Sequence, residues 1–326
     1  MLVRTVLGDL DADALGRVDY HEHLFQVSPL LPGDELDDES ASGREALALR
    51  DSGFSAMVDA TPTGLGRQPA ALARISASTG LTVIATTGAH REAHYPAGHW
   101  LTSLGVDRLA ALFVRDITSG MPRLDGPGAP DGASGPDGRS VRAGMLKAGI
   151  GYWSITQFEH RVLHAVGLAH ARTNAPVMVH LEHGSAPFEV LDVLAGHGVA
   201  PDAVVLAHVD RNPDPGLHRE LAAAGAYLGY DGFARTRTWP DSTLIGLIGE
   251  VADLGGADRI LLGGDVARRS RYTAYGGMPG LAYLGARVVP RLVAEGRGDL
   301  VTTALVHNPA RLLARHLDSN QSRSNS

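Results

Sequence analysis

Two histidines near the start of the chain, His21 and His23, are the residues best suited to chemistry. Side chains of a strand alternate between its two faces, so both imidazoles are expected on one face and Glu22 on the other. Neutral imidazole is a common protein ligand for zinc, iron, cobalt and manganese. The pair therefore offers half of a metal site, provided that other parts of the chain supply partners.

Eight short apolar segments along the chain indicate strands, and stretches with helical spacing, such as Gln157–Thr173 and Phe188–Gly196, lie between them. The segments are 16–23, 55–59, 81–88, 142–147, 176–181, 203–208, 226–231 and 259–265. Strands that alternate with helices imply a parallel sheet, and eight such units fit a closed (β/α)8 TIM barrel. An open doubly wound sheet is the alternative, but no glycine-rich phosphate turn follows any segment.

Barrels of this kind carry their chemistry at the C-terminal ends of the strands. The ends of five segments supply side chains that could bind a metal or react: His21, His23, Lys147, His180, His208 and Asp265. Any one of these histidines could be a buried side chain with a satisfied hydrogen bond. Four histidines and an aspartate at one level of a barrel instead favour a metal centre.

Lys147 is the unusual member of this set. Burial disfavours an ammonium group and lowers its pKa, so the amine becomes neutral more easily. A neutral lysine amine can react with carbon dioxide to give a carbamate. Because the carbamate is anionic and carboxylate-like, it can bridge two cations, and we expect N6-carboxylysine at position 147.

The same segments resemble the phosphotriesterase family of the amidohydrolase superfamily, from about residue 3 to residue 315. The matching runs are Val18–Leu24, Arg142–Lys147, Val177–His180, Val204–His208, Ile260–Asp265 and Val306–Leu313. The resemblance implies a metal-dependent hydrolase with two divalent ions, zinc being usual and manganese, iron or cobalt the alternatives. It assigns His21, His23 and Asp265 to the more buried metal, His180 and His208 to the more exposed one, and carboxylated Lys147 to the bridge. It also makes a homodimer an option, since dimers are common in the family.

Two divalent ions about 3.5–4 Å apart lower the pKa of a shared water to near neutrality. The resulting bridging hydroxide would attack a carbonyl or phosphoryl centre whose oxygen is polarised by the more exposed metal. Asp265 is the candidate catalytic residue, taking the proton during attack and passing it to the leaving group.

Arginines in the loops after the last two predicted strands point to an anionic substrate. Arg235 lies in one loop, and Arg268 and Tyr272 lie in the other, whose run resembles the branch that hydrolyses lactones of phosphorylated sugars. The planar fork of arginine suits a phosphate or a carboxylate, so these three residues are candidates for substrate binding. Alternatively, the arginines are solvated or pair with acidic residues such as Asp231.

The sequence thus predicts a lactonase or carboxylic ester hydrolase, with a phosphorylated sugar lactone as one substrate class. An organophosphate triesterase on the same metals, with a more apolar pocket, is the alternative. A non-catalytic metal- or ligand-binding barrel is a third hypothesis, against which the bridging lysine argues. Tyr152, Trp153 and His183 are expected in loops that border the mouth of the site, where aromatic side chains more often serve packing.

The composition agrees with a large globular domain: 44% of the 326 residues are hydrophobic and the net charge is −7. That balance disfavours a nucleic-acid partner, and the absence of cysteine excludes thiolate ligands and a thiol nucleophile. No signal peptide or membrane segment is evident, so we expect a cytoplasmic protein. We expect one domain over 1–318, a flexible Gly/Pro-rich insertion at 119–140 and a disordered tail at 319–326.

Overall fold

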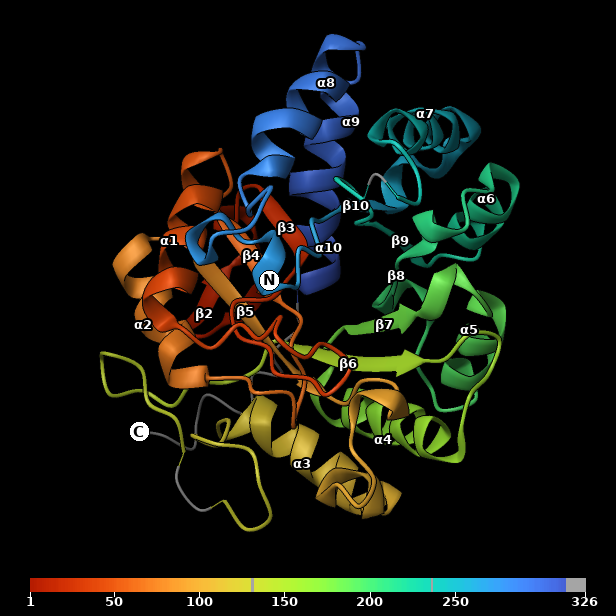
Figure 1. Ribbon diagram of the computed structural model, residues 1–326. Coiled ribbons are helices and arrows are strands. Elements are labelled where there is room, and N and C mark those ends of the chain that lie inside the picture. The colour runs from red at the N-terminus through yellow and green to blue at the C-terminus, as the bar shows by residue number, and fades with distance from the viewer. Residues whose placement is uncertain (130–131, 236, 315–326) are drawn as a thin grey trace.

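The computed structural model describes residues 1–129, 132–235 and 237–314. At its centre, eight parallel strands curl into a nearly closed barrel, and helices cover the outside (Figure 1). The strands are β3 (Val18–Glu22), β4 (Ala56–Asp59), β5 (Thr82–Gly88), β6 (Met145–Ile150), β7 (Val177–Leu181), β8 (Val204–Ala207), β9 (Tyr227–Tyr230) and β10 (Ile260–Leu262). The predicted TIM barrel is confirmed.

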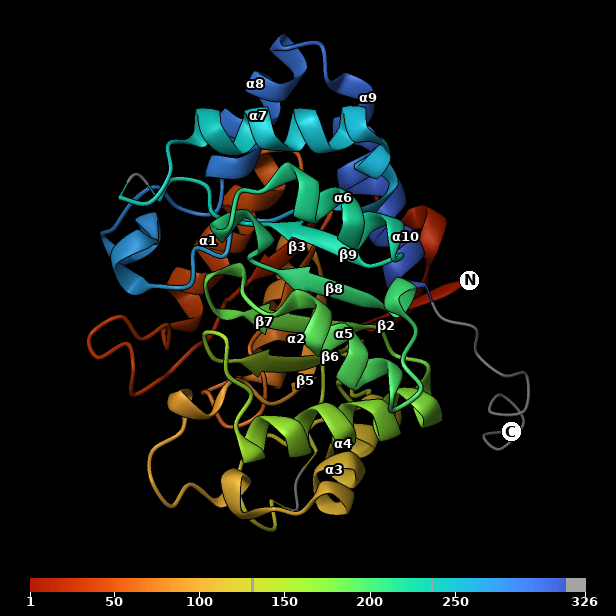
Figure 2. The same cartoon turned by 90° about the vertical axis from the view of Figure 1, so that its right-hand side faces the viewer.

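Each strand of the barrel pairs with the next one along the chain, from β3 to β10. The seam between β10 and β3 is held by hydrogen bonds just past the end of β10. The backbone N–H of Asp265 donates to the carbonyl of His21 (2.9 Å), and that of Gly264 donates to the carboxylate of Asp19 (3.3 Å). Figure 2 shows the strand arrows pointing to the same side, so their C-terminal ends gather at one mouth.

A cluster of buried apolar side chains fills the interior of the barrel below this mouth. Its buried members include Val18, Tyr20, Val58, Ile84, Met145, Met178, Val205 and Leu261. Strand β3 has a register shift between Asp19 and Glu22. Because of this shift, Tyr20 packs in the apolar cluster, while the next residue, His21, borders the cavity at the mouth of the barrel. The bulge therefore lies at the boundary between the apolar interior of the barrel and the polar cavity at its mouth.

The outer layer is formed by helices that pack apolar faces against the sheet. They are α1 (Glu39–Asp51), α2 (Pro69–Thr79), α3 (Val106–Thr118), α4 (Gln157–Thr173), α5 (Pro187–Ala195), α6 (Pro215–Ala223), α7 (Asp241–Val251), α8 (Val289–Ala294), α9 (Gly298–Thr302) and α10 (Asn308–Leu313). Helix α4 has the bounds expected from its sequence because Thr156 and Glu159 form a capping box at its start and Asn174 ends it in a left-handed conformation. Within the described residues, no helix is long and apolar enough to cross a membrane.

Two features of the fold differ from the sequence predictions. An antiparallel hairpin of β1 (Leu2–Thr5) and β2 (Gly8–Asp11) precedes the barrel and was not predicted. Strand β6 also continues three residues past Lys147, because Gly149 and Ile150 still pair with β7. The predicted end of this strand at Lys147 was therefore wrong, and the lysine lies deeper in the barrel than the histidines.

The insertion at 119–140 is anchored in the parts that the structure describes. Met121 and Ala133 are buried, and the N–H of Ala133 donates to the carbonyl of Met121 (2.9 Å). Asp125 accepts a hydrogen bond from buried Arg67 in the loop after β4 (2.7 Å). These contacts hold the described parts of the insertion against the barrel, and its flexibility stays a prediction. The predicted tail at 319–326 lies outside the described residues.

Candidate metal centre

The polar strand ends surround a cavity of about 340 Å³ at the mouth of the barrel. The cavity is bordered by His21, His23, Gln26, Leu30, Leu31, His90, Arg91, His94, His180, Glu182, His208, Arg211, Arg235, Asp265, Ala267 and Arg268. Five of the six predicted metal ligands are among these residues. The sixth, Lys147, lies just beneath, with its Nζ 3.3 Å from Nε2 of His21.

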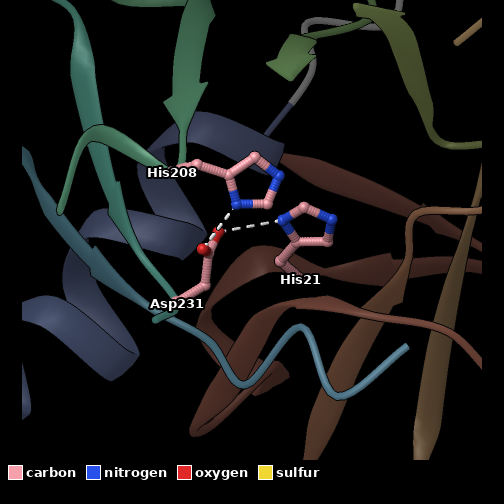
Figure 3. Close-up of side chains that lie close together, drawn as sticks. All are labelled: His21, His208 and Asp231. Atoms are coloured by element: carbon pink, nitrogen blue, oxygen red, sulfur yellow. Dashed lines mark hydrogen bonds and ion pairs between the residues drawn. The ribbon is translucent and has the colours of Figure 1, made fainter. Parts of the chain in front are cut away.

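The carboxylate of Asp231, just past the end of β9, orients two of these histidines (Figure 3). Its two oxygens accept hydrogen bonds from Nδ1 of His21 (3.1 Å) and Nδ1 of His208 (2.6 Å). With the proton of each ring on Nδ1, both Nε2 atoms keep a lone pair. Burial alone would raise the pKa of Asp231, but His208 and His21 hold it below its ordinary value, so the carboxylate stays ionised.

His23 is oriented by a neutral partner. Its Nδ1 lies 2.8 Å from the hydroxyl of Thr61, which itself donates to the carbonyl of Phe25 (2.7 Å). Because a hydroxyl has one proton to give, the Thr61 oxygen must accept from Nδ1 of His23. The Nε2 lone pair of His23 is therefore also free to bind a cation.

His180 is turned the opposite way. Its Nε2 lies 2.8 Å from the carboxylate of Glu182, so Nδ1 carries the lone pair and faces Nε2 of His208 at 2.8 Å. Two ring lone pairs cannot face each other at this distance without a proton or a cation to share. Burial lowers the pKa of both rings, which disfavours the proton and leaves a cation as the better partner.

Asp265 presents its two carboxylate oxygens to different groups. Oδ1 lies 3.7 Å from Nε2 of His21 and 3.6 Å from Nε2 of His23. Oδ2 accepts from Arg235 (2.5 Å) and Arg211 (3.1 Å). Burial would raise the pKa of Asp265, but the nearby cations, Arg235 foremost, hold it well below its usual range. Oδ1 thus joins the two Nε2 atoms as an anionic donor.

Lys147 is buried, and that burial lowers the pKa of its amine to about 8. The backbone of β5 passes so close that a Cβ on Gly88 would lie 2.0 Å from the carbonyl oxygen of Lys147. Nζ donates to the sulfur of Met178 (2.9 Å), a weak acceptor that does little to stabilise an ammonium. The amine is therefore easily made neutral, as carbamate formation requires.

These donor atoms fit divalent metal ions. The ligand atoms of His21, His23 and Asp265 all lie within 4.8 Å of one another. The facing nitrogens of His180 and His208 form a second donor pair, and Lys147 lies below His21. Each inward nitrogen keeps its lone pair because the opposite ring nitrogen is hydrogen-bonded, which is the arrangement that metal-binding histidines adopt. The individual ligand assignments stay predictions.

The three predicted substrate-binding residues are placed differently. Arg235 and Arg268 border the cavity, and Arg268 lies 3.7 Å from Asp34 with about half of its side chain (48%) exposed. Tyr272 does not border the cavity: it is fully buried, and its hydroxyl donates to the backbone carbonyl of His23. The structure therefore places Tyr272 outside the cavity, because the loop after β10 folds back and this ring contacts the end of β3.

Several cavity residues were missed from the sequence. Glu182 lies two residues after His180, and Arg211 lies three residues after His208. Neither residue was predicted, although the first turn after a barrel strand borders the mouth as well as the strand end does. Arg91, in the loop after β5, pairs with Glu182 (3.2 Å).

Comparison with known proteins gives consistent matches along the chain. A profile of the Phosphotriesterase family matches residues 1–313. A phospho-furanose lactonase of Mycoplasmopsis synoviae is 30% identical over 95% of this chain and 91% of its own length. An N-acetyltaurine hydrolase of Danio rerio is 29% identical over 95% of this chain and 97% of its own length.

Solved structures show the same architecture. A lactonase from Listeria monocytogenes superimposes with a TM-score of 0.86 at 30% identity, covering 97% of this chain and all of that one (100%). An amidohydrolase from Mycoplasma synoviae gives a TM-score of 0.89 at 29% identity, covering 99% and 96% of the two chains. At these identities the likeness extends beyond the barrel fold to the sequence.

Proposed function

The chain belongs to the phosphotriesterase family and is a hydrolase that acts on ester bonds, and from this premise we propose that it opens lactones with two bound divalent metal ions. The substrate class that we propose is the lactone of a phosphorylated sugar. One observation carries the proposal: a cavity bordered by side chains that could bind metal ions is also bordered by four arginines. The name of the phospho-furanose lactonase relative supports this substrate class, and the lactonase from Listeria monocytogenes supports lactone opening.

His21, His23 and Asp265 would hold one metal ion and His180 and His208 the other, with carboxylated Lys147 shared between them. Zinc is the proposed metal, with manganese, iron and cobalt as alternatives. Bound at these residues, the ions supply Lewis acidity and a water of lowered pKa. The protein's own contribution is to keep each ligand atom aimed inward through Asp231, Thr61 and Glu182.

The arginines explain why the substrate would be anionic. Arg91, Arg211, Arg235 and Arg268 border the cavity against two carboxylates, Glu182 and Asp265. Arg268 projects furthest into solvent, and its guanidinium can exchange Asp34, 3.7 Å away, for a substrate phosphate. A neutral triester would gain nothing from this charge, so the cavity supports the lactonase over the triesterase alternative.

Asp265 is the proposed proton acceptor, and the structure suggests how its reactivity is controlled. Its Oδ2 accepts hydrogen bonds from Arg235 and Arg211, which keep it ionised but occupy its lone pairs. A substrate anion competes for the Arg235 guanidinium. Once Arg235 turns to that anion, Oδ2 has a lone pair available for the proton released during attack.

Hydrolysis of matched substrates by the metal-loaded protein tests this proposal. We expect a sugar γ-lactone with a phosphate to have a higher kcat/KM than the same lactone without it, and both to exceed a neutral aryl triester. Asp265→Asn should abolish turnover, whereas Asp253→Asn, at an exposed site paired with Arg297, should not. Faster hydrolysis of the triester than of either lactone would overturn the proposal.

A further inference from the structure

A second, wider cavity of about 830 Å³ lies beside the metal-site cavity. It is bordered by Arg91, Tyr152, Trp153, Glu182, His183, Ser185, Arg211 and Asn212. Arg91, Glu182 and Arg211 border both cavities, so these three side chains form a shared wall. The metal-site cavity therefore adjoins a second cavity that lies over the loops that follow β6, β7 and β8.

Trp153 is held on the surface of this second cavity by the backbone of its loop. Its side chain is 61% exposed, although its backbone has a φ of 47°, a left-handed conformation that bulky residues rarely adopt. The N–H of Trp153 donates to Ser185 Oγ (3.0 Å), and that buried hydroxyl donates to the carbonyl of Glu182 (2.7 Å). Backbone strain that neighbouring contacts maintain is common at ligand sites.

Two more flat side chains lie beside this indole. Tyr152 is 61% exposed, and its ring meets the rings of Trp153 and His183 edge to face, with centroids 6.5 and 5.7 Å apart. His183 also has a left-handed φ of 53°. Rings from two loops thus present exposed edges and faces on one side of the cavity.

The shared wall adds positive charge to this aromatic surface. Arg91 is paired with Glu182 (3.2 Å), and Arg211 is paired with Asp265 (3.1 Å). A guanidinium has five N–H donors, so each arginine keeps donors beyond these pairs. Exposed aromatic faces beside arginines suit a planar group that carries a negative charge.

We propose that the second cavity is a subsite for the part of the substrate remote from the lactone ring, and that this part is a flat aromatic group with an anionic substituent. The inference rests on the proposed function, because it takes the scissile ring to lie in the metal-site cavity. Trp153 and Tyr152 stack on the flat group, and Arg91 binds its anion across the shared wall.

Two probe lactones test the subsite. Both are α-amino-γ-butyrolactones, one acylated with acetyl and the other with 4-carboxybenzoyl. We expect the kcat/KM ratio of the aromatic probe over the acetyl probe to fall about tenfold in Trp153→Ala, the size of effect that loss of one stacking partner produces. Trp239→Ala is the matched control, since Trp239 is also partly exposed on a loop but borders neither cavity. Tyr152→Ala gives a second, independent variant.

Direct binding separates this inference from the proposed function. The chain has three tryptophans, so Trp100→Phe with Trp239→Phe leaves Trp153 as the only indole. We expect its fluorescence to be quenched by the ring-opened aromatic probe and not by the ring-opened acetyl probe. Quenching without hydrolysis of either probe or of the phosphorylated sugar lactone would keep the subsite and overturn the proposed function. The subsite would be overturned if both probes are hydrolysed and their kcat/KM ratio stays unchanged in Trp153→Ala and Tyr152→Ala. It would equally be overturned if these substitutions changed the oligomeric state and left that ratio unchanged.

Discussion

Replacement of Asp231 by Asn tests the orientation of the candidate ligands. The carboxylate accepts hydrogen bonds from Nδ1 of His21 and Nδ1 of His208, and also from the hydroxyl of Tyr20. An amide has one accepting oxygen and a donating NH₂ group, so it cannot accept from both rings at their present positions. One imidazole must therefore turn or move its proton to Nε2, and that nitrogen then has no lone pair for a metal.

The size of the effect follows from the lost interaction. Hydrogen bonds to charged groups contribute roughly 1.5–3 kcal/mol, and loss of an outer partner of a metal-binding histidine lowers metal affinity about 10- to 100-fold. We expect Asp231→Asn to weaken zinc binding by that factor while the barrel stays folded. Zinc affinity is measured by competition with a chelator, and folding by circular dichroism.

Asp116→Asn is the matched control. Asp116 is fully buried like Asp231, but it binds Arg67 and Thr87, and neither borders the metal-site cavity. This variant is expected to lose stability without losing metal affinity. If a folded Asp231→Asn protein bound two zinc ions as tightly as the unaltered protein, our account of how the histidines are oriented would be wrong.

Three further predictions concern Lys147 and Arg268. Lys147→Ala should bind less than two metal equivalents and lose turnover, as metal analysis and kinetics would show; full activity would exclude the bridging role. Because burial lowers the Lys147 pKa to about 8, its neutral fraction grows as pH rises through that value. Metal-free protein should therefore take up carbon dioxide, measured with labelled bicarbonate, much more slowly one unit below that pH, where about a tenth of the amine is neutral. Arg268→Ala should lower kcat/KM about 10-fold or more for a phosphorylated lactone and little for its neutral analogue, since a bond to a charged group contributes roughly 1.5–3 kcal/mol; equal losses would contradict the anion contact.

Much of the fold was predictable because the barrel repeats one simple pattern. Most strands are short, buried runs dominated by apolar residues between helices, so the eight predicted segments overlap the eight observed strands. Strand ends were harder to predict. The polar lysine at position 147 suggested an end, yet pairing of Gly149 and Ile150 with β7 carries β6 further.

The outer partners of the candidate site were less predictable, because barrel closure brings them together. Asp231 was seen only as a partner for nearby arginines, although it contacts His21 from 210 residues away. Tyr272 was assigned to substrate because it follows Arg268 in sequence. No local pattern shows that its hydroxyl turns inward to the carbonyl of His23.

The most direct test of the central claim is a metal titration of the chelator-treated protein, in the presence of bicarbonate, with a phosphorylated sugar lactone as substrate. We predict no hydrolysis without metal and activity that rises with added zinc until two equivalents per chain are bound. Full activity without metal, or metal binding at two equivalents with no hydrolysis of any lactone or ester, would contradict the account.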